Sequence, residues 1–310
     1  MIALRIFFLT FHLLLMNFAA AGPLLAVWLD IRGVDRESPE TQRLGQSVGW
    51  WSLAALGLGM VLGSGQLLLF WSVGFTEYFD TIFRLWDSKI VYGLWEIGFS
   101  VVCLVGYLVW WQRSSRPHKW QRIVSRGLAV LAATNLLYHF PTLFTIIGLL
   151  ARSGEASAEP ITGADFRVLL VQPEVIAMTL HFWLASFAVS GLVVSLVSVG
   201  ETIPDKSIAS RGAQVCLVAT LLQLPVGFYF TTVLRVTEQS RLLGGDMLAT
   251  LTFLAAIFAA LWLLHLLASL AVFQVDRPKL WQAAIAMVAT VALMTASMIL
   301  SRNGFPPPTT

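Results

Sequence analysis

The chain has 310 residues, of which 57% are hydrophobic and only 12% are charged, and its formal net charge at pH 7 is +3. A soluble domain carries about 25% charged residues, so this composition excludes an ordinary soluble globular protein. The mean hydropathy of +0.77 indicates that the lipid bilayer is the solvent, and the small net charge gives no sign of nucleic-acid binding. Cys103 and Cys216 lie in apolar stretches and predict neither a disulfide framework nor covalent heme attachment.

Eight apolar segments are long enough to cross a bilayer, which takes about 20 residues of α-helix. The connections between them are short, so residues 1–310 are predicted to form one integral-membrane domain. We expect an all-α polytopic fold with two halves of four helices each. The expected helices span residues 2–29, 49–73, 88–111, 127–151, 174–199, 212–234, 245–273 and 280–300.

The first segment has a second interpretation, because Arg5, an apolar stretch and the small residues FAAAG are also typical of a signal peptide. The apolar run continues through Pro23 to Trp28, which is longer than the core of a signal peptide, and it carries His12. We therefore expect this segment to be a transmembrane helix.

Basic residues predict how the chain is oriented, because loops rich in lysine and arginine stay in the cytoplasm. With strict alternation, 12 of the 20 lysines and arginines fall on one side of the membrane and 8 on the other. Both termini are therefore predicted to face the periplasm, in a bacterial inner membrane. The strongest signal is the connection after the third segment, with Arg113, Arg116, Lys119, Arg122 and Arg126.

The first and fifth segments share the motif T-x-H-x-x-L-x-x-F-A-x-x-G, which places His12 and His181 at corresponding positions. Imidazole is a strong axial ligand of heme iron, and burial keeps it neutral and able to coordinate. The alternative for a membrane histidine is a hydrogen bond to a neighbouring helix. Two histidines in matching contexts and at a similar depth favour heme.

Other residues of the motif have two interpretations each. The hydroxyls of Thr10 and Thr179 are able to bond to the backbone or to contact a heme propionate. Small residues two and three turns beyond each histidine leave room for a macrocycle or for a closely packed helix: Ala19, Gly22, Ala188 and Gly191.

Two more candidate residues fall in the same outer layer of the membrane. Met247 is near the outer start of the seventh segment, and Glu96 is inside the third. A carboxylate within a bilayer is costly and is a functional candidate by default. The structural alternative for Glu96 is an ion pair with Lys89 or Arg84.

In these features the chain resembles subunit I of the cytochrome bd-type quinol oxidases, over roughly residues 2 to 200. The resemblance rests on the order and spacing of several motifs rather than on any single one. The matching residues are His12, Gly59 and Gly63, Glu96, Thr134-Asn135-Leu136, Gln172-Pro173 and His181.

The resemblance implies heme b, one to three groups in number, and assigns roles to individual residues. His12 matches the ligand of a high-spin heme, and Glu96 matches a glutamate near that heme that serves as a ligand, a proton carrier or the partner of a basic residue. His181 matches the ligand of a low-spin heme, with Met247 in the place of its methionine partner. The arginine that precedes this methionine in the family is missing, and Asp246 stands there instead.

The chain also departs from the family. The long quinol-binding loop of the family corresponds here to about ten residues, 235–244, and the family's GRQPW-type segment has no match. The last segment contains no acidic residue to match the family's glutamate ligand. The heme scaffold is therefore expected to be present and the family's quinol site to be missing.

Two membrane histidines, His139 and His265, lie outside the family's pattern, and a further histidine, His118, lies in the basic connection. His139 is near the middle of the fourth segment, beside Pro141, which frees a backbone carbonyl. It is a candidate ligand for a further heme, or it bonds to that carbonyl. His265, toward the cytoplasmic end of the seventh segment, is expected to be interhelical or interfacial, and His118 to be solvated.

The sequence thus predicts a membrane b-type cytochrome subunit that relays electrons within a respiratory complex. The expected partners are other subunits of that complex, a periplasmic c-type cytochrome or iron–sulfur protein, and the quinone pool. Two alternatives stay open: an oxygen-reducing bd-like oxidase subunit, and a heme-free transporter or scaffold.

Overall fold

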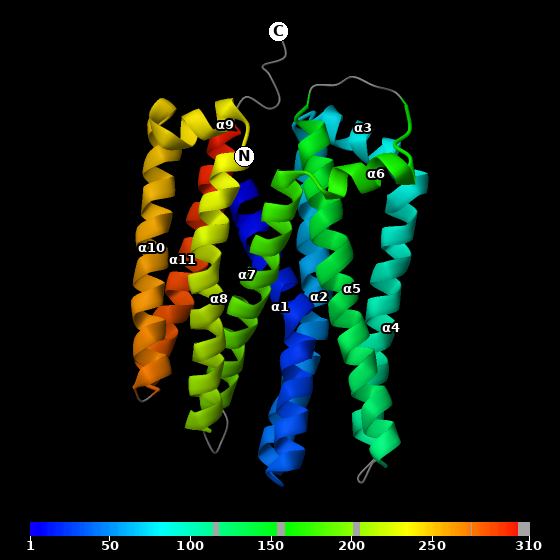
Figure 1. Ribbon diagram of the computed structural model, residues 1–310, viewed down its shortest axis with the longest axis vertical. Helices are drawn as coiled ribbons and strands as arrows, with labels where there is room; N and C mark the ends of the chain where they lie inside the picture. The colour runs from blue at the N-terminus through cyan, green and yellow to red at the C-terminus, as the bar shows by residue number, and fades with distance from the viewer. Residues whose placement is uncertain (114–117, 154–158, 201–204, 274, 303–310) are drawn as a thin grey trace.

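The structure is a computed structural model, and it describes residues 1–113, 118–153, 159–200, 205–273 and 275–302. Within these ranges, eight helices are long and apolar enough to cross a membrane, which confirms the predicted polytopic all-α fold. They run side by side along the long axis of the molecule (Figure 1). Their bounds are α1 Ile2–Asp35, α2 Pro39–Ser72, α4 Val91–Arg113, α5 Lys119–Ala151, α7 Pro173–Gly200, α8 Lys206–Val233, α10 Met247–Val272 and α11 Arg277–Ser301.

Most of the long helices extend beyond their apolar runs, because a helix that leaves the hydrocarbon layer keeps its backbone hydrogen bonds. Capping residues then decide where they begin. α2 begins ten residues before its predicted start, where the Ser38 hydroxyl accepts from the Thr41 amide at 3.2 Å. α8 is capped by Asp205, whose Oδ1 accepts from the amides of Ser207 at 2.9 Å and Ile208 at 3.0 Å.

Short helical elements that the sequence did not predict connect the long helices at the end of the bundle where the N-terminus lies (Figure 1). These connections pass from α2 to α4, from α5 to α7 and from α8 to α10. The elements are α3 Thr76–Arg84, the π-helical turn η1 Trp86–Ile90, α6 Gly163–Leu170, α9 Val236–Ser240 and the π-helical turn η2 Arg241–Gly245. We call the end of the bundle that carries these short elements the outer end.

The long helices form two halves, α1–α2–α4–α5 and α7–α8–α10–α11, which meet mainly through α1 and α7. Each central helix also contacts the last helix of the other half, α1 with α11 and α7 with α5. The halves meet at corresponding positions: Asn17 and Ser186 both stand five residues after a motif histidine. The Ser186 hydroxyl donates to Asn17 Oδ1 at 3.0 Å, and both side chains are buried. The sequence motif thus marks a structural repeat.

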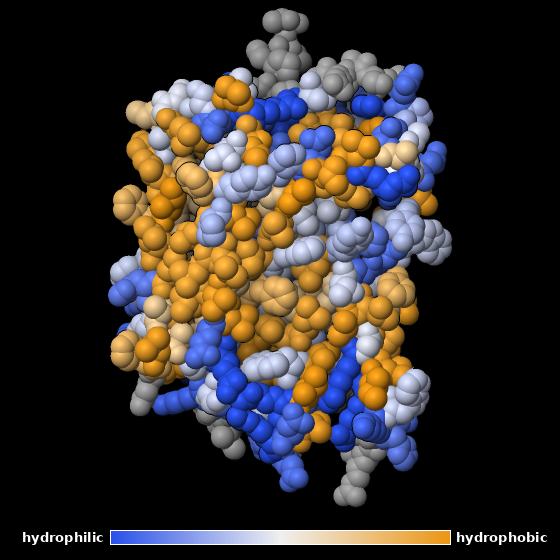
Figure 2. Space-filling model, viewed as in Figure 1, coloured by the Kyte–Doolittle hydropathy of each residue, from blue (hydrophilic) through white to orange (hydrophobic). Residues whose placement is uncertain are grey.

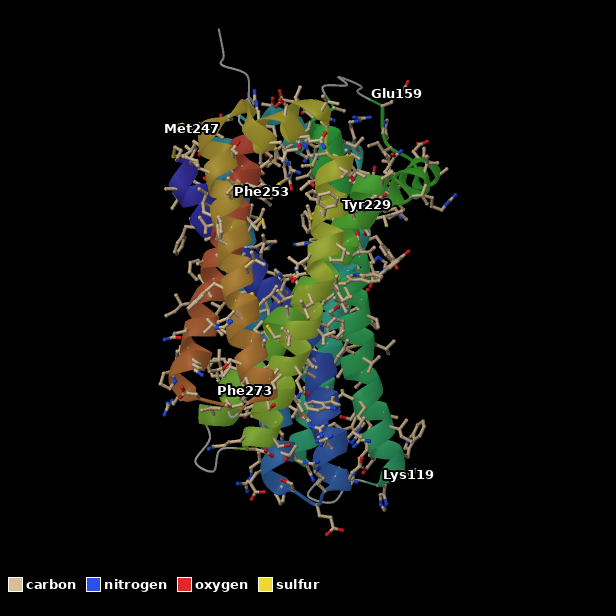
Figure 3. All side chains as sticks on the ribbon, turned by 60° about the vertical axis from the view of Figure 1, so that its left-hand side comes forward. Lys119, Glu159, Tyr229, Met247, Phe253 and Phe273 are labelled. Atoms are coloured by element: carbon tan, nitrogen blue, oxygen red, sulfur yellow. The ribbon has the colours of Figure 1, made fainter. Side chains whose placement is uncertain are left out.

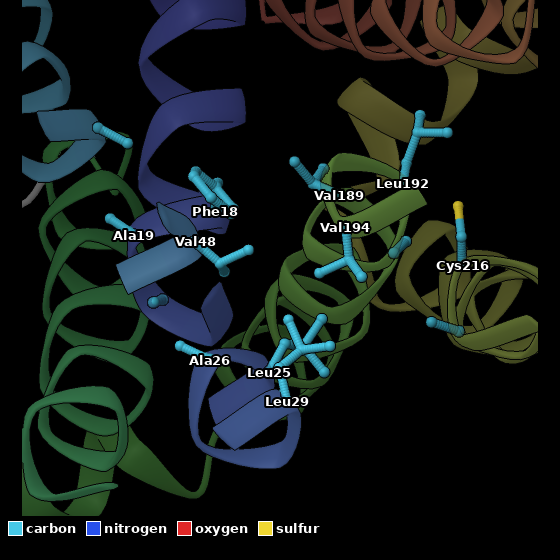
Figure 4. Close-up of a cluster of buried hydrophobic side chains, with 14 of the residues drawn as sticks. Phe18, Ala19, Leu25, Ala26, Leu29, Val48, Val189, Leu192, Val194 and Cys216 are labelled. Atoms are coloured by element: carbon cyan, nitrogen blue, oxygen red, sulfur yellow. The ribbon is translucent and has the colours of Figure 1, made fainter. Parts of the chain in front are cut away.

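The two glycines of the motif serve close helix packing. A Cβ on Gly22 would overlap the Ser52 hydroxyl of α2, and a Cβ on Gly191 would lie 2.6 Å from the Gly212 carbonyl oxygen of α8. The first and second helices of each half therefore approach closely. The same core buries Cys103 and Cys216 as free thiols, as expected (Figure 4 shows Cys216 with α1 and α7 side chains).

The predicted orientation can be measured by cysteine labelling, since both native cysteines are buried. We expect a cysteine at exposed His118 to react with a membrane-impermeant maleimide only from the cytoplasmic side, and one at exposed Val171 only from the periplasmic side. The opposite pattern would reverse the topology. Arg116, part of the basic connection behind this prediction, lies outside the described residues.

Candidate functional site

His12 is held by two glycines of α2. Its Nδ1 lies 2.7 Å from the Gly59 carbonyl oxygen. A carbonyl only accepts hydrogen bonds, so this contact assigns the hydrogen to Nδ1 and the lone pair to Nε2. A Cβ on Gly63, one turn outward on α2, would lie 2.8 Å from His12 Cε1. Gly59 therefore fixes the tautomer, and Gly63 makes room for the ring.

His181 repeats this arrangement on α8. A Cβ on Gly227 would lie 3.9 Å from His181 Cε1, so a glycine of the second helix again faces the histidine of the first. The His181 Nε2 atom is 3.4 Å from Gln223 Nε2. Its Nδ1 atom is buried and has no hydrogen-bond partner among the described residues. Gln223 is a polar residue inside the apolar α8, and this contrast is the sequence signal that could have identified it.

The motif threonines are buried as deeply as core residues, with Thr10 2% and Thr179 8% exposed. Neither hydroxyl has a hydrogen-bond partner in the described part of the chain, so the backbone bond considered for them is not made there. Two residues correspond to about 200° around a helix, so each hydroxyl leaves its helix on a different side from the histidine. The geometry therefore does not favour a contact with a heme on the same histidine.

The two histidines suit heme better than a bare metal ion. Among the described residues, no group of three or more His, Cys, Asp or Glu side chains is placed to hold a metal ion. A porphyrin supplies four nitrogen ligands itself and needs only one or two axial side chains. His12, with Nε2 carrying the lone pair, fits that requirement. At His181 the facing amide nitrogen of Gln223 is a donor, so Nε2 is the ring nitrogen that carries the lone pair.

Glu96 faces α5 rather than the predicted basic partners. Tyr92, one turn away on α4, and His139 of α5 both lie within electrostatic range of the Glu96 carboxylate. The rings of Tyr92 and His139 are 5.6 Å apart and edge-to-face. Asn135 donates to the Glu96 backbone carbonyl at 2.8 Å. Glu96 and His139 thus form a second polar cluster, between α4 and α5, whereas His12 contacts α2.

The two basic residues considered as partners of Glu96 are engaged elsewhere. Lys89 lies over the ring of Phe166, 4.5 Å from its centroid. Arg84 donates from Nε to the Glu159 carbonyl at 3.0 Å.

The backbone carbonyl considered as a partner of His139 accepts a hydrogen bond from Trp183 instead. Pro141 lacks an amide hydrogen, so the carbonyl of Leu137, four residues earlier, has no intrahelical donor. Trp183 of α7 donates to this carbonyl from Nε1 at 2.7 Å. The bond ties α7 to α5 two residues beyond His181.

Met247 is the candidate that the structure does not bring to a histidine. It is the first residue of α10, its side chain is 77% exposed, and it lies at the outer edge of the bundle (Figure 3). The polar contact of His181 comes from α8 instead. His265, also on α10, stacks on Trp262 with ring centroids 5.7 Å apart, consistent with an interfacial histidine.

An ionic network at the outer end was not predicted, because its four members come from four separate elements. Arg152 pairs with Glu174, and its Nε atom is 3.0 Å from Glu238 Oε1. Arg302 Nε is 3.2 Å from Glu238 Oε2, and its Nη2 is 3.8 Å from Glu174 Oε1. Glu174 stands seven residues before His181, about two turns outward on the same face of α7. The network ties α9 to α7 and α11 of the second half and to the end of α5 of the first half.

Comparison with protein-family models and with curated proteins finds no match. Among solved structures, the chain matches the bd oxidase from Geobacillus thermodenitrificans with a TM-score of 0.70 and 12% sequence identity, over 96% of this chain and 84% of that one. The chain has the bd oxidase fold. The match to the bd oxidase fold covers almost the whole chain, whereas the sequence motifs matched only over roughly residues 2 to 200. At 12% identity, the roles of individual residues have to be argued from their own geometry.

Proposed function

We propose that this chain is a b-type heme subunit of a membrane redox complex, with His12 and His181 each an axial ligand of one heme. One observation carries the proposal: in each half, the motif histidine of the first helix faces a glycine of the second helix. In the first copy Nε2 carries the lone pair because Nδ1 faces the Gly59 carbonyl, and in the second Nε2 carries it because it faces the Gln223 amide nitrogen. The likeness to the fold of a bd oxidase supports a respiratory role.

The residues around His12 prepare it for this role. The hydrogen bond to Gly59 fixes the orientation of the ring and makes Nε2 a stronger electron donor. Phe8, Leu15 and Met16, about one turn from His12 on α1, are apolar and contact Gly65 and Gly59 of α2. Bound heme would supply one-electron redox chemistry.

The position of the histidines supports a role in electron relay. Both lie in the half of the bundle nearer the outer end, which the basic residues assign to the periplasm. We propose that electrons pass between the quinone pool and a periplasmic partner such as a c-type cytochrome or an iron–sulfur protein. His139, in the cluster with Glu96, is the candidate ligand for a third heme.

The test is heme content and spectrum after single substitutions. We expect His181→Ala to remove a low-spin component from the reduced-minus-oxidised spectrum and His12→Ala to remove a different component. Each variant should lose about one heme per chain by the pyridine hemochrome assay, because no other described side chain replaces the axial nitrogen.

His265→Ala is the matched control, since this exposed membrane histidine stacks on Trp262 away from both motifs. It should keep the full heme content. Full heme content in both motif variants would refute the assignment of His12 and His181 as ligands and make the repeated motif a packing feature. Absence of heme from the unmodified protein would favour the heme-free transporter or scaffold.

A further inference from the structure

Three arginines gather at the inner end of the bundle, where the two halves meet. Arg32 and Arg36 are one turn apart near the end of α1, and Arg211 belongs to α8. Both Arg36 and Arg211 lie within electrostatic range of Arg32. Figure 2 shows a strongly hydrophilic band at this end, across the lower ends of α8 and α1. We call Arg32, Arg36 and Arg211 the inner arginine cluster.

The acidic residue near Arg32 is already engaged. Asp205 lies within electrostatic range of Arg32, but its Oδ1 atom caps α8 by accepting from the amides of Ser207 and Ile208. The Nε atom of Arg32 is buried and has no hydrogen-bond partner among the residues that the structure describes. Like charges within electrostatic range repel one another, so the cluster is suited to an added anion.

The depth of the cluster indicates where that anion comes from. The guanidinium of Arg32 lies over the ring of Trp28, 5.7 Å from its centroid, one turn further into the bundle. Tryptophan rings of this kind sit at the level of the lipid headgroups, and the arginine fork matches the oxygen atoms of a phosphate. We therefore expect Arg32 to lie at the depth of lipid phosphates.

We propose that the inner arginine cluster binds the phosphate of an anionic phospholipid, which then bridges α1 of the first half and α8 of the second. This site is separate from the histidines, and the proposal does not depend on heme binding. A free phosphate ion offers the same chemistry, so the experiment has to distinguish the two sources.

The experiment titrates delipidated full-length protein in detergent with phosphatidylglycerol, phosphatidylcholine or inorganic phosphate. Native mass spectrometry measures the bound lipid, and the thermal unfolding midpoint measures its effect on the fold. We expect phosphatidylglycerol to bind in preference to phosphatidylcholine and to raise the midpoint. The double variant Arg32→Gln/Arg211→Gln should bind phosphatidylglycerol about 25-fold more weakly, because each arginine near the surface contributes about fivefold.

Two variants keep the test specific. Lys119→Gln/Arg122→Gln removes two charges from α5 at the same end and should bind phosphatidylglycerol as the unmodified protein does. If the glutamine variant does not fold, Arg32→Lys/Arg211→Lys takes its place in the test. This variant keeps the charge and should retain most of the affinity. Equal binding of the two lipids, an equal loss in the α5 variant, or a full midpoint shift with inorganic phosphate alone would each overturn the lipid site.

Discussion

Glu238→Ala is expected to lower the free energy of unfolding by about 3–5 kcal/mol, the cost of leaving a buried charge without its partner. The Glu238 side chain is 8% exposed and binds two guanidinium groups, one from the end of α5 and one from the end of α11. In the variant, Glu174 would be the one carboxylate of the network left to balance the charges of Arg152 and Arg302. Unfolding by SDS in mixed micelles would measure the loss.

Two comparisons separate the ionic network from a general effect of charge. Asp80→Ala removes an exposed carboxylate of α3 and should change the stability by less than about 0.5 kcal/mol. Glu238→Leu combined with Arg302→Leu removes both members of a pair, so it should cost less than Glu238→Leu alone. A stability of Glu238→Ala equal to that of the unmodified protein would show that the network does not hold α9.

Purified chain without partner subunits is expected to bind heme but to show no steady oxygen consumption with a short-chain quinol above that of heme-free protein. The resemblance to the oxidases associates quinol oxidation with a soluble loop between the sixth and seventh transmembrane helices. Here α9 and η2 fill that connection, and Glu238 and Leu242 are buried against the bundle. A segment this short cannot fold over a heme as a separate soluble loop.

The measurement is oxygen uptake in detergent after addition of the quinol. Reduction of the iron by dithionite and its reoxidation by a soluble c-type cytochrome would show that the hemes are competent. Steady oxygen uptake by the chain alone would contradict the electron-relay proposal and support the bd-like oxidase.

The sequence by itself determined the eight helices and the repeated histidine motif. In a bilayer every backbone amide must be bonded within its own segment, so an apolar run of sufficient length has to be a helix. The likeness to a bd oxidase was also visible in the order of motifs, and the structural comparison confirms it at the level of the fold. His12 and His181 were identified as corresponding residues by their neighbours in sequence, and the contact between Asn17 and Ser186 shows that the two motifs meet in the fold.

Tertiary structure alone decided which face of each helix meets which neighbour. In a membrane the lipid is as apolar as a neighbouring helix, so the pattern of apolar residues does not mark the packed side. The pairing of Gly63 with His12, the outward position of Met247 and the contact of Glu96 with Tyr92 were therefore hidden in the sequence. The ionic network was hidden for a related reason. Its charges lie at the ends of α5, α7 and α11 and on α9, and only the packing of the helices brings them together.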